Sequence, residues 1–223
     1  PLGISAWPGY VAINHVVKNR LASWLGGGLF GFSPYIMAQS LGHLDLILMF
    51  YPPLAMVLFD EIAIRQRKDW RLVGLALGLL TAAQLLIFEE IVVGVAIAVS
   101  ISLVVASLMW RSQLRTHWKY ALKSVAISVL VCVLCCGWVL WHQIASPDAP
   151  PGLREVASNG LGTDLLAFVT PTSNQLISPA FAQQISIRFA AKTTGADDYL
   201  GPFLFILLGV TIGTLWKRYL VRL

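Results

Sequence analysis

Two adjacent carboxylates, Glu89 and Glu90, are the residues best suited to chemistry, and they interrupt an otherwise uncharged run from 72 to 110. Paired acids can act as a general base or hold a divalent cation through their oxygen atoms. Their charges repel each other, and no Gly or Pro stands beside them to turn the chain easily. Solvated interfacial glutamates would give the same pattern, so both interpretations stay open.

A second polar group lies further upstream. Tyr35, Gln39 and His43 recur at a spacing of four, so a helix running from Leu21 to His43 would place them on one face of its last two turns. Asp45 follows at the same expected membrane boundary. These side chains could line a cavity for a phosphate or a sugar, or they could bond to one another in headgroup water.

Three other polar residues lie near expected helix ends. Gln84 is about one turn from Thr81, and hydrogen bonding between helices explains it at least as well as substrate binding does. Asp198 and Tyr199 stand just before the last apolar stretch. Helix capping and an interfacial tyrosine explain those two without any ligand.

Motifs of soluble enzymes are absent from the sequence. Tyr35 replaces the second glycine of a nucleophile elbow in Gly31-Phe32-Ser33-Pro34-Tyr35, and no phosphate-binding glycine loop ends in Lys-Ser or Lys-Thr. The only cysteines, Cys132, Cys135 and Cys136, lie inside an apolar run. We expect them to pack between helices, and we predict no metal site.

The composition indicates a membrane protein. Of 223 residues, 57% are hydrophobic and 12% are charged, which is about half the charge of an ordinary soluble domain. This excludes a nucleic-acid binder despite the net charge of +5. The chain opens with Pro1 and shows no signal peptide, so we expect it to be part of a longer protein.

Uncharged stretches predict an all-α integral membrane protein with about six transmembrane helices. About 17 to 20 apolar residues suffice to cross a bilayer. The predicted crossings are 21–42, 46–64 (bent at Pro52 and Pro53), 72–88, 91–110, 124–141 and 200–216. The run from 72 to 110 would form a helix about 58 Å long, so it must fold back near the two glutamates.

The basic residues predict the orientation and the domains. Thirteen of the sixteen Lys and Arg residues fall in four clusters, which six crossings would place together on the cytoplasmic side. The expected divisions are 1–145 with about five spans, 146–199 as an external loop with short helices, and 200–223 as the last span with its basic end. Gly27/Gly31, Gly74/Gly78 and Gly209/Gly213 have the spacing that lets membrane helices approach closely.

Several short motifs resemble those of a known superfamily. They are Gly31 to Tyr35 (GFSPY), Gln39 to Leu46 (QSLGHLDL), Pro52-Pro53-Leu54, Gln84 to Glu90 (QLLIFEE) and Asp198 to Gly201 (DYLG). Together they resemble bacterial multi-spanning proteins of the GT-C superfamily of membrane glycosyltransferases. That resemblance implies transfer of a sugar from a polyprenyl-phosphate donor, with inversion, on the outer face of the bacterial cytoplasmic membrane.

The resemblance also implies roles for residues. The catalytic base of the superfamily is an acid in the first external loop, which we expect upstream of this chain, so no catalytic residue is assigned here. Glu89, Glu90, His43 and Asp45 would then support the donor phosphate, the sugar or a metal. Tyr35, Gln39 and Gln84 would bind substrate, and Asp198 and Tyr199 would border the acceptor. Asp45 and Phe88 depart from the expected amide and small polar residue.

Two other functions fit the same residues. One is a carrier or flippase for a lipid-linked or small polar solute, gated by Glu89, Glu90 and His43, because acids within membranes also mark transport routes. The other is a non-catalytic assembly subunit that uses its glycine faces. The expected partners are the bilayer and a polyprenyl-phosphate-linked sugar, without nucleic acid, and a divalent cation is the one cofactor considered.

Overall fold

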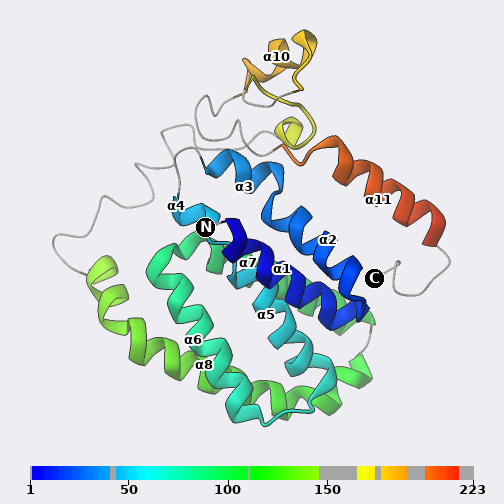
Figure 1. Ribbon diagram of the computed structural model, residues 1–223. Coiled ribbons are helices and arrows are strands. Elements are labelled where there is room, and N and C mark those ends of the chain that lie inside the picture. Colours follow the sequence, from blue (N-terminus) through cyan, green and yellow to red (C-terminus); the bar gives the residue numbers. More distant parts are fainter. Residues whose placement is uncertain are drawn as a thin grey trace. The chain divides into compact units, whose positions relative to one another are not determined.

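The computed structural model describes residues 2–40, 44–109, 111–145, 165–173, 177–189 and 199–215, and every regular element in this part of the chain is a helix (Figure 1). The chain divides into two compact units, which are described separately. The first comprises Pro1–Phe32 and His43–Pro150, and the second comprises Ser33–Gly42 and Pro151–Leu223.

The helices of each unit have the following bounds. The first unit contains α1 (Leu2–Val17), α2 (Arg20–Gly31), α4 (Leu44–Ile47), α5 (Tyr51–Asp60), the π-helix η1 (Glu61–Arg65), α6 (Trp70–Ile87), α7 (Glu89–Met109) and α8 (Arg111–Ala145). The second unit contains α3 (Pro34–Gln39), the 3₁₀-helix η2 (Leu165–Phe168), α10 (Ala180–Ser186) and α11 (Pro202–Leu215).

The all-α membrane class is confirmed. Four segments are long and apolar enough to cross a bilayer, namely Asp45–Arg65, Trp70–Ile87, Glu89–Leu108 and Thr116–Gln143. Large apolar side chains such as Leu108 and Leu134 remain exposed along them, which is costly in water and natural in lipid. The predicted six crossings are not all found in the described chain, because the apolar part of α11, Leu204–Thr214, is shorter.

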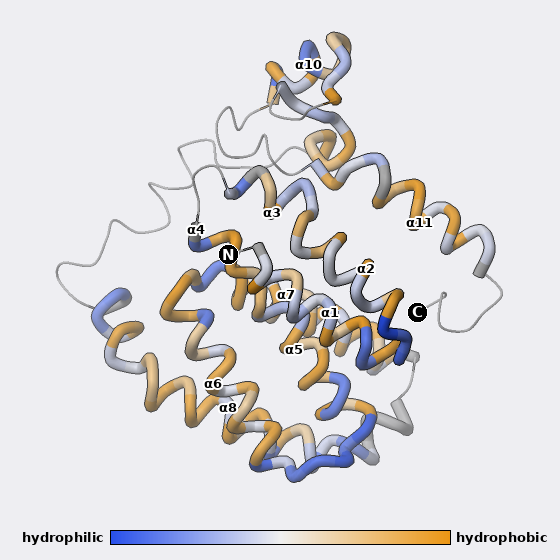
Figure 2. The backbone as a smooth tube through the Cα atoms, in the orientation of Figure 1, coloured by the Kyte–Doolittle hydropathy of each residue, from blue (hydrophilic) through white to orange (hydrophobic). Residues whose placement is uncertain are grey.

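Exposed tryptophans lie toward both ends of α8, with Trp118 near its start and Trp138 and Trp141 near its end. Tryptophan is enriched at the two interfaces of a bilayer. Figure 2 shows that the middles of α6 and α8 are largely hydrophobic, whereas the connection between α5 and α6 is hydrophilic.

The first predicted crossing, 21–42, is wrong. α2 ends at Gly31, and the separate helix α3 begins at Pro34. Ser33 precedes a proline, a position that disfavours helical backbone, so the chain breaks there. Instead of crossing alone, α2 packs antiparallel to α1, a helix that the sequence analysis did not predict.

Small residues allow α1 and α2 to approach closely. A Cβ atom at Gly27 would lie 2.7 Å from the backbone nitrogen of Tyr10, and one at Gly31 would lie 2.5 Å from the Cβ of Ala6. The predicted role of this glycine pair is therefore confirmed. By contrast, a Cβ atom placed at Gly209 or Gly213 would meet no neighbouring atom of the described chain within 4 Å, so close packing is not observed there.

The same kind of contact joins α6 to α8, and these two helices are parallel (Figure 1). A Cβ atom at Gly78 would lie 2.9 Å from the Ser128 carbonyl oxygen and 2.7 Å from the Val131 Cβ. The Sγ of Cys132 donates to the Gly78 carbonyl at 3.3 Å, and that of Cys136 donates to the Ala82 carbonyl at 3.5 Å. The cysteines thus pack between helices, as predicted.

The predicted bend at Pro52 and Pro53 is in fact a helix start. The prolines occupy the first turn of α5, where their missing N–H groups cost nothing, and the non-helical backbone lies at 48–50. Ser5 of α1 compensates the break, because its hydroxyl donates to the Ile47 carbonyl and accepts from the Met49 N–H at 3.1 Å.

The predicted fold-back near the glutamates is confirmed. α6 ends at Ile87, α7 begins at Glu89, and Phe88 between them is extended, with φ −164° and ψ 110°. A single residue therefore reverses the chain. The hydrophobic core beneath this hairpin is shared by α5, η1, α6 and α7, and its buried members are Tyr51, Ala55, Ile62, Val73, Leu77 and Ile91.

We predict that Gly78→Ala destabilises the first unit by about 1–3 kcal/mol, because the added methyl group collides with backbone of α8. Gly94→Ala in α7 is the matched control, since a Cβ atom there meets nothing within 4 Å and alanine favours helix. Denaturant unfolding in mixed micelles measures both variants. Equal stability of the two variants would show that the close approach of α6 and α8 is wrong.

Candidate functional site

Glu89 and Glu90 lie in the first turn of α7 at one end of the first unit, called here the acidic end. Both side chains are exposed. The Nε2 of Gln143, near the end of α8, donates to the Oε1 of Glu89 at 2.8 Å. Negative charge is favourable at a helix N-terminus, which offsets part of the repulsion between the two carboxylates.

Gln84 lies just below this pair, in the last turn of α6. Its side chain is fully buried, and its Nε2 donates to the Phe88 carbonyl at 3.4 Å. The Phe88 N–H donates in turn to the Gln84 carbonyl at 2.8 Å, so Gln84 holds both ends of the turn residue. The Oε1 of Gln84 has no hydrogen-bond partner among the described residues. Gln143 is thus joined directly to Glu89, and Gln84 is linked to them only through the backbone of Phe88.

Asp45 is not joined to this group. It lies half-buried in the first turn of α4, before the break at 48–50. Among the described residues, no hydrogen bond or ion pair links its carboxylate to Glu89 or Glu90.

The other predicted site residues belong to the second unit or lie outside the description. Tyr35 and Gln39 are both in α3, with Gln39 buried, but α3 is not the continuation of a helix from Leu21. Tyr199 is half-buried just before α11. His43 and Asp198 lie outside the described residues.

Two of the short motifs come into contact through residues of the second unit. Gly201 has a φ of +83°, a conformation that favours glycine. A Cβ atom there would lie 3.1 Å from the Cγ of Pro34. The contact brings Pro34 close to Gly201. Tyr35 directly follows Pro34, and Tyr199 lies two residues before Gly201, so each motif has a tyrosine close to the contact in sequence.

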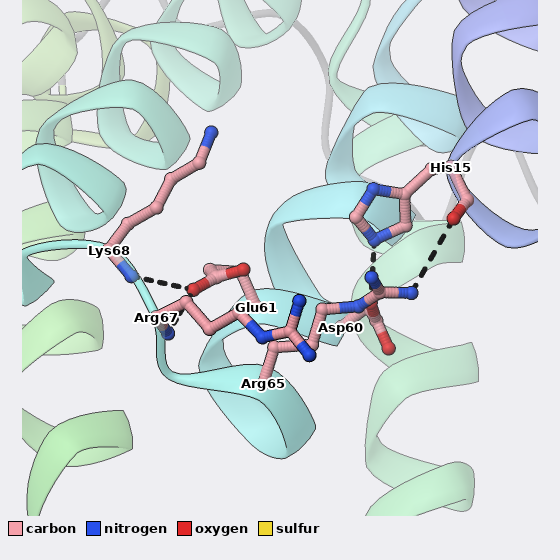
Figure 3. Close-up of polar contacts among 6 residues, drawn as sticks. All are labelled: His15, Asp60, Glu61, Arg65, Arg67 and Lys68. Carbon is pink, nitrogen blue, oxygen red and sulfur yellow. Dashed lines mark hydrogen bonds and ion pairs between the residues drawn. The ribbon is translucent and has the colours of Figure 1, made fainter.

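A second polar cluster, which the sequence analysis missed, lies at the opposite end of the first unit (Figure 3). The Oδ2 of Asp60 is 2.6 Å from the Nε2 of His15 and accepts from the Nε of Arg65 at 2.5 Å. The Nη2 of Arg65 also donates to the His15 carbonyl at 3.5 Å. The three side chains are only 22–26% exposed, so they fix the end of α1 to α5 and η1.

Glu61 organises the loop that follows. Its side chain is buried, and its Oε1 accepts from the backbone N–H groups of Arg67 and Lys68, the latter at 2.8 Å (Figure 3). Gln66 has a positive φ of 50° and donates from Nε2 to the carbonyls of Ile62 and His117 at 2.9 and 3.0 Å. The loop is therefore held by the Glu61 carboxylate of η1 and by the hydrogen bond from Gln66 to α8.

One feature of the sequence indicated this cluster, namely where its two acidic residues stand. Asp60 and Glu61 are acids at the end of an apolar stretch, just before the basic run from Arg65 to Arg71. Such acids commonly pair with nearby cations, so Arg65 was within reach of sequence reasoning. His15 was not, because it lies 45 residues from Asp60 and no periodicity connects them.

The described chain contains no built metal centre. No group of three or more His, Cys, Asp or Glu side chains that could hold a metal ion is found there. Glu89 and Glu90 offer only two carboxylates, with an amide beside one of them.

No family model, no curated protein and no solved structure matches this chain.

We predict that Asp60→Asn destabilises the first unit by about 1–3 kcal/mol, because hydrogen bonds to a charged group are lost and Arg65 keeps its charge beside His15. Asp69→Asn is the control. Asp69 caps α6 by accepting from the Arg71 N–H, and Asn caps helices about equally well. Denaturant unfolding of both variants tests this, and equal loss of stability would contradict it.

Proposed function

We propose that this chain is a membrane glycosyltransferase-like protein that handles a polyprenyl-phosphate-linked sugar at its acidic end. On this proposal the membrane is the bacterial cytoplasmic membrane. The acidic end faces outward and the basic loops face the cytoplasm. The sugar donor approaches from the bilayer, and the acceptor arrives from water.

One observation carries the proposal: Glu89 and Glu90 stand exposed where two membrane-length helices meet through one residue. Among the described residues, neither carboxylate has a cationic partner, and only the Gln143 amide contacts Glu89. Adjacent unneutralised acids are unfavourable for a turn with no other purpose. Carboxylates and amides at a membrane boundary are suited to hydrogen bonding with sugar hydroxyl groups.

The distribution of charge supports the orientation. The loop that joins η1 to α6 carries Arg67 and Lys68, and Arg71 lies in the first turn of α6, whereas α6 ends beside the acidic pair. The two ends of the same helix thus have opposite charge. Because Lys and Arg collect on the cytoplasmic side of membrane proteins, the acidic end would face outward.

The chemistry of the proposal leaves one role unassigned. An acceptor hydroxyl loses its proton to a carboxylate and attacks the anomeric carbon, while the lipid phosphate leaves with the bond electrons. Glu89 and Glu90 are placed here as supporting groups for the sugar, and Gln84 as the residue that positions their turn. The base itself is not assigned to this chain.

A carrier or flippase is the second candidate, and one feature favours it. The membrane-length segment Asp45–Arg65 is irregular twice, at 48–50 and in the π-helix Glu61–Arg65. Broken helices that bear ionisable groups build the transport sites of many carriers. The buried Glu61 would then belong to the pathway.

We predict that Glu89→Gln and Glu90→Gln each lower sugar transfer from a polyprenyl-phosphate donor by about tenfold or more, since each removes a charged acceptor of hydrogen bonds. Transfer is measured with membranes that contain the protein and a panel of polyprenyl-phosphate-sugar donors. Folding should be unaffected, because both side chains are exposed.

The controls separate chemistry from structure. Asp69→Asn removes one acid at the other end of α6 and should leave transfer unchanged. Gln143→Leu keeps both carboxylates but frees Glu89, so it should have a smaller effect than Glu89→Gln. Undiminished transfer by both glutamine variants would remove the acidic pair from the site. Loss of donor translocation without loss of transfer would favour the carrier.

A further inference from the structure

At the end of the first unit where α6 begins, called here the basic end, an exposed cationic patch surrounds Trp70. The Cζ of Arg71 lies 5.1 Å from the centre of the Trp70 ring, and the Nζ of Lys123 lies 5.4 Å from it. Arg71 lies in the first turn of α6 and Lys123 lies on α8, so the patch spans the parallel pair. Lys68 and Lys119 flank it, and both side chains are exposed.

The carboxylates near this patch are already engaged. Asp60 binds His15 and Arg65, and Glu61 accepts from two backbone N–H groups of the loop. Asp69 caps the start of α6. Among the described residues, no carboxylate forms an ion pair with Arg71 or Lys123.

Glu61 and Asp69 keep their negative charges, but neither forms an ion pair with Arg71 or Lys123 among the described residues. Arg71 and Lys123 both contact the Trp70 ring, so two positive charges gather around one side chain. An anionic group that reaches both cations would be attracted by both charges. A phosphate is the natural candidate, because arginine can contact it through two N–H groups and lysine adds a point charge.

The surroundings of the patch identify the source of that phosphate as a lipid. On α6, Leu72 and Leu75 are exposed and follow Arg71 into the membrane-length helix, with Leu75 one turn beyond Arg71. These apolar side chains continue from the cations toward the middle of the bilayer. Trp70 lies between the two zones, where tryptophan is favoured at an interface.

We propose that Trp70, Arg71 and Lys123 form a binding site for the headgroup of an anionic phospholipid. The phosphate contacts the guanidinium and the ammonium group, and the acyl chains run along the exposed leucines of α6. Lys68 and Lys119 add attraction from the rim. This site is separate from the acidic end, so its test does not depend on the proposed transferase function.

The double variant Arg71→Gln/Lys123→Gln tests the site. Each basic residue near an anionic lipid surface contributes about fivefold to binding, so the double variant should bind phosphatidylglycerol about 25-fold more weakly. Binding of phosphatidylcholine with the same acyl chains should not change. Titration of the detergent-solubilised chain, followed by native mass spectrometry, counts the bound lipids.

The matched control is Lys18→Asn/Arg20→Gln, which removes two charges from the α1–α2 connection at the same end. Asn is chosen because Lys18 has a positive φ of 54°. The control should bind phosphatidylglycerol within about threefold of the parent chain. A charge-conserving double variant, Arg71→Lys/Lys123→Arg, should retain most of the binding and exclude a folding defect.

Three results would overturn the proposal. The first is no preference of the parent chain for phosphatidylglycerol over phosphatidylcholine. The second is an equal loss of binding in the test and control variants, which would indicate diffuse attraction to the whole basic end. The third is displacement of the phospholipid by inorganic phosphate at constant ionic strength, which would make this a site for free phosphate.

Discussion

The parallel packing of α6 on α8 is the constraint on which the rest of the first unit depends. Helices that run in the same direction keep a nearly constant difference in residue number along their contact. Within the two helices that difference is 54 for the pairs Gly78–Cys132 and Ala82–Cys136. It is similar just outside α6, with 54 for Glu89–Gln143 at the start of α7 and 52 for Lys68–Tyr120 in the loop before α6, where the Tyr120 hydroxyl donates to the Lys68 carbonyl at 2.8 Å. Such contacts need small residues, because interhelical attraction in lipid comes from close packing and hydrogen bonds.

This packing links the two ends of the unit. At one end it sets Gln143 against Glu89, and at the other it sets Lys123 against Trp70. A shift of α8 by one turn, about 5.4 Å, would separate both pairs at once. The contacts of α8 at both ends therefore depend on the Gly78 and Cys132 contact in the apolar middle. The carboxylates of the basic end, Asp60 and Glu61, are used for structure, so its exposed cations remain available to lipid.

Local sequence patterns predicted most of the long helices, but they could not predict contacts between residues far apart in the sequence. The hairpin at Phe88 followed from the length of an uncharged run, and close packing at Gly78 followed from residue spacing. The helix break before Pro34 could also have been predicted, because the residue before a proline disfavours helical backbone. The prediction of one continuous helix instead followed the regular spacing of Tyr35 and Gln39. The pairing of His15 with Asp60 depends on how α1 packs against α5, which no pattern within either segment encodes.

The register of α6 and α8 can be measured by disulfide crosslinking in the membrane. With Cys132 and Cys135 changed to Ser, a cysteine introduced by Ala82→Cys should form a disulfide with Cys136 on mild oxidation, because Cys136 Sγ already lies 3.5 Å from the Ala82 carbonyl. Ala83→Cys, at an exposed position on the next residue, should leave Cys136 reduced. The mass of the proteolytic peptides reads out both reactions. Crosslinking at position 82 alone is the result predicted by a parallel pair in this register, whereas no crosslink at 82, or an equal one at 83, would contradict it.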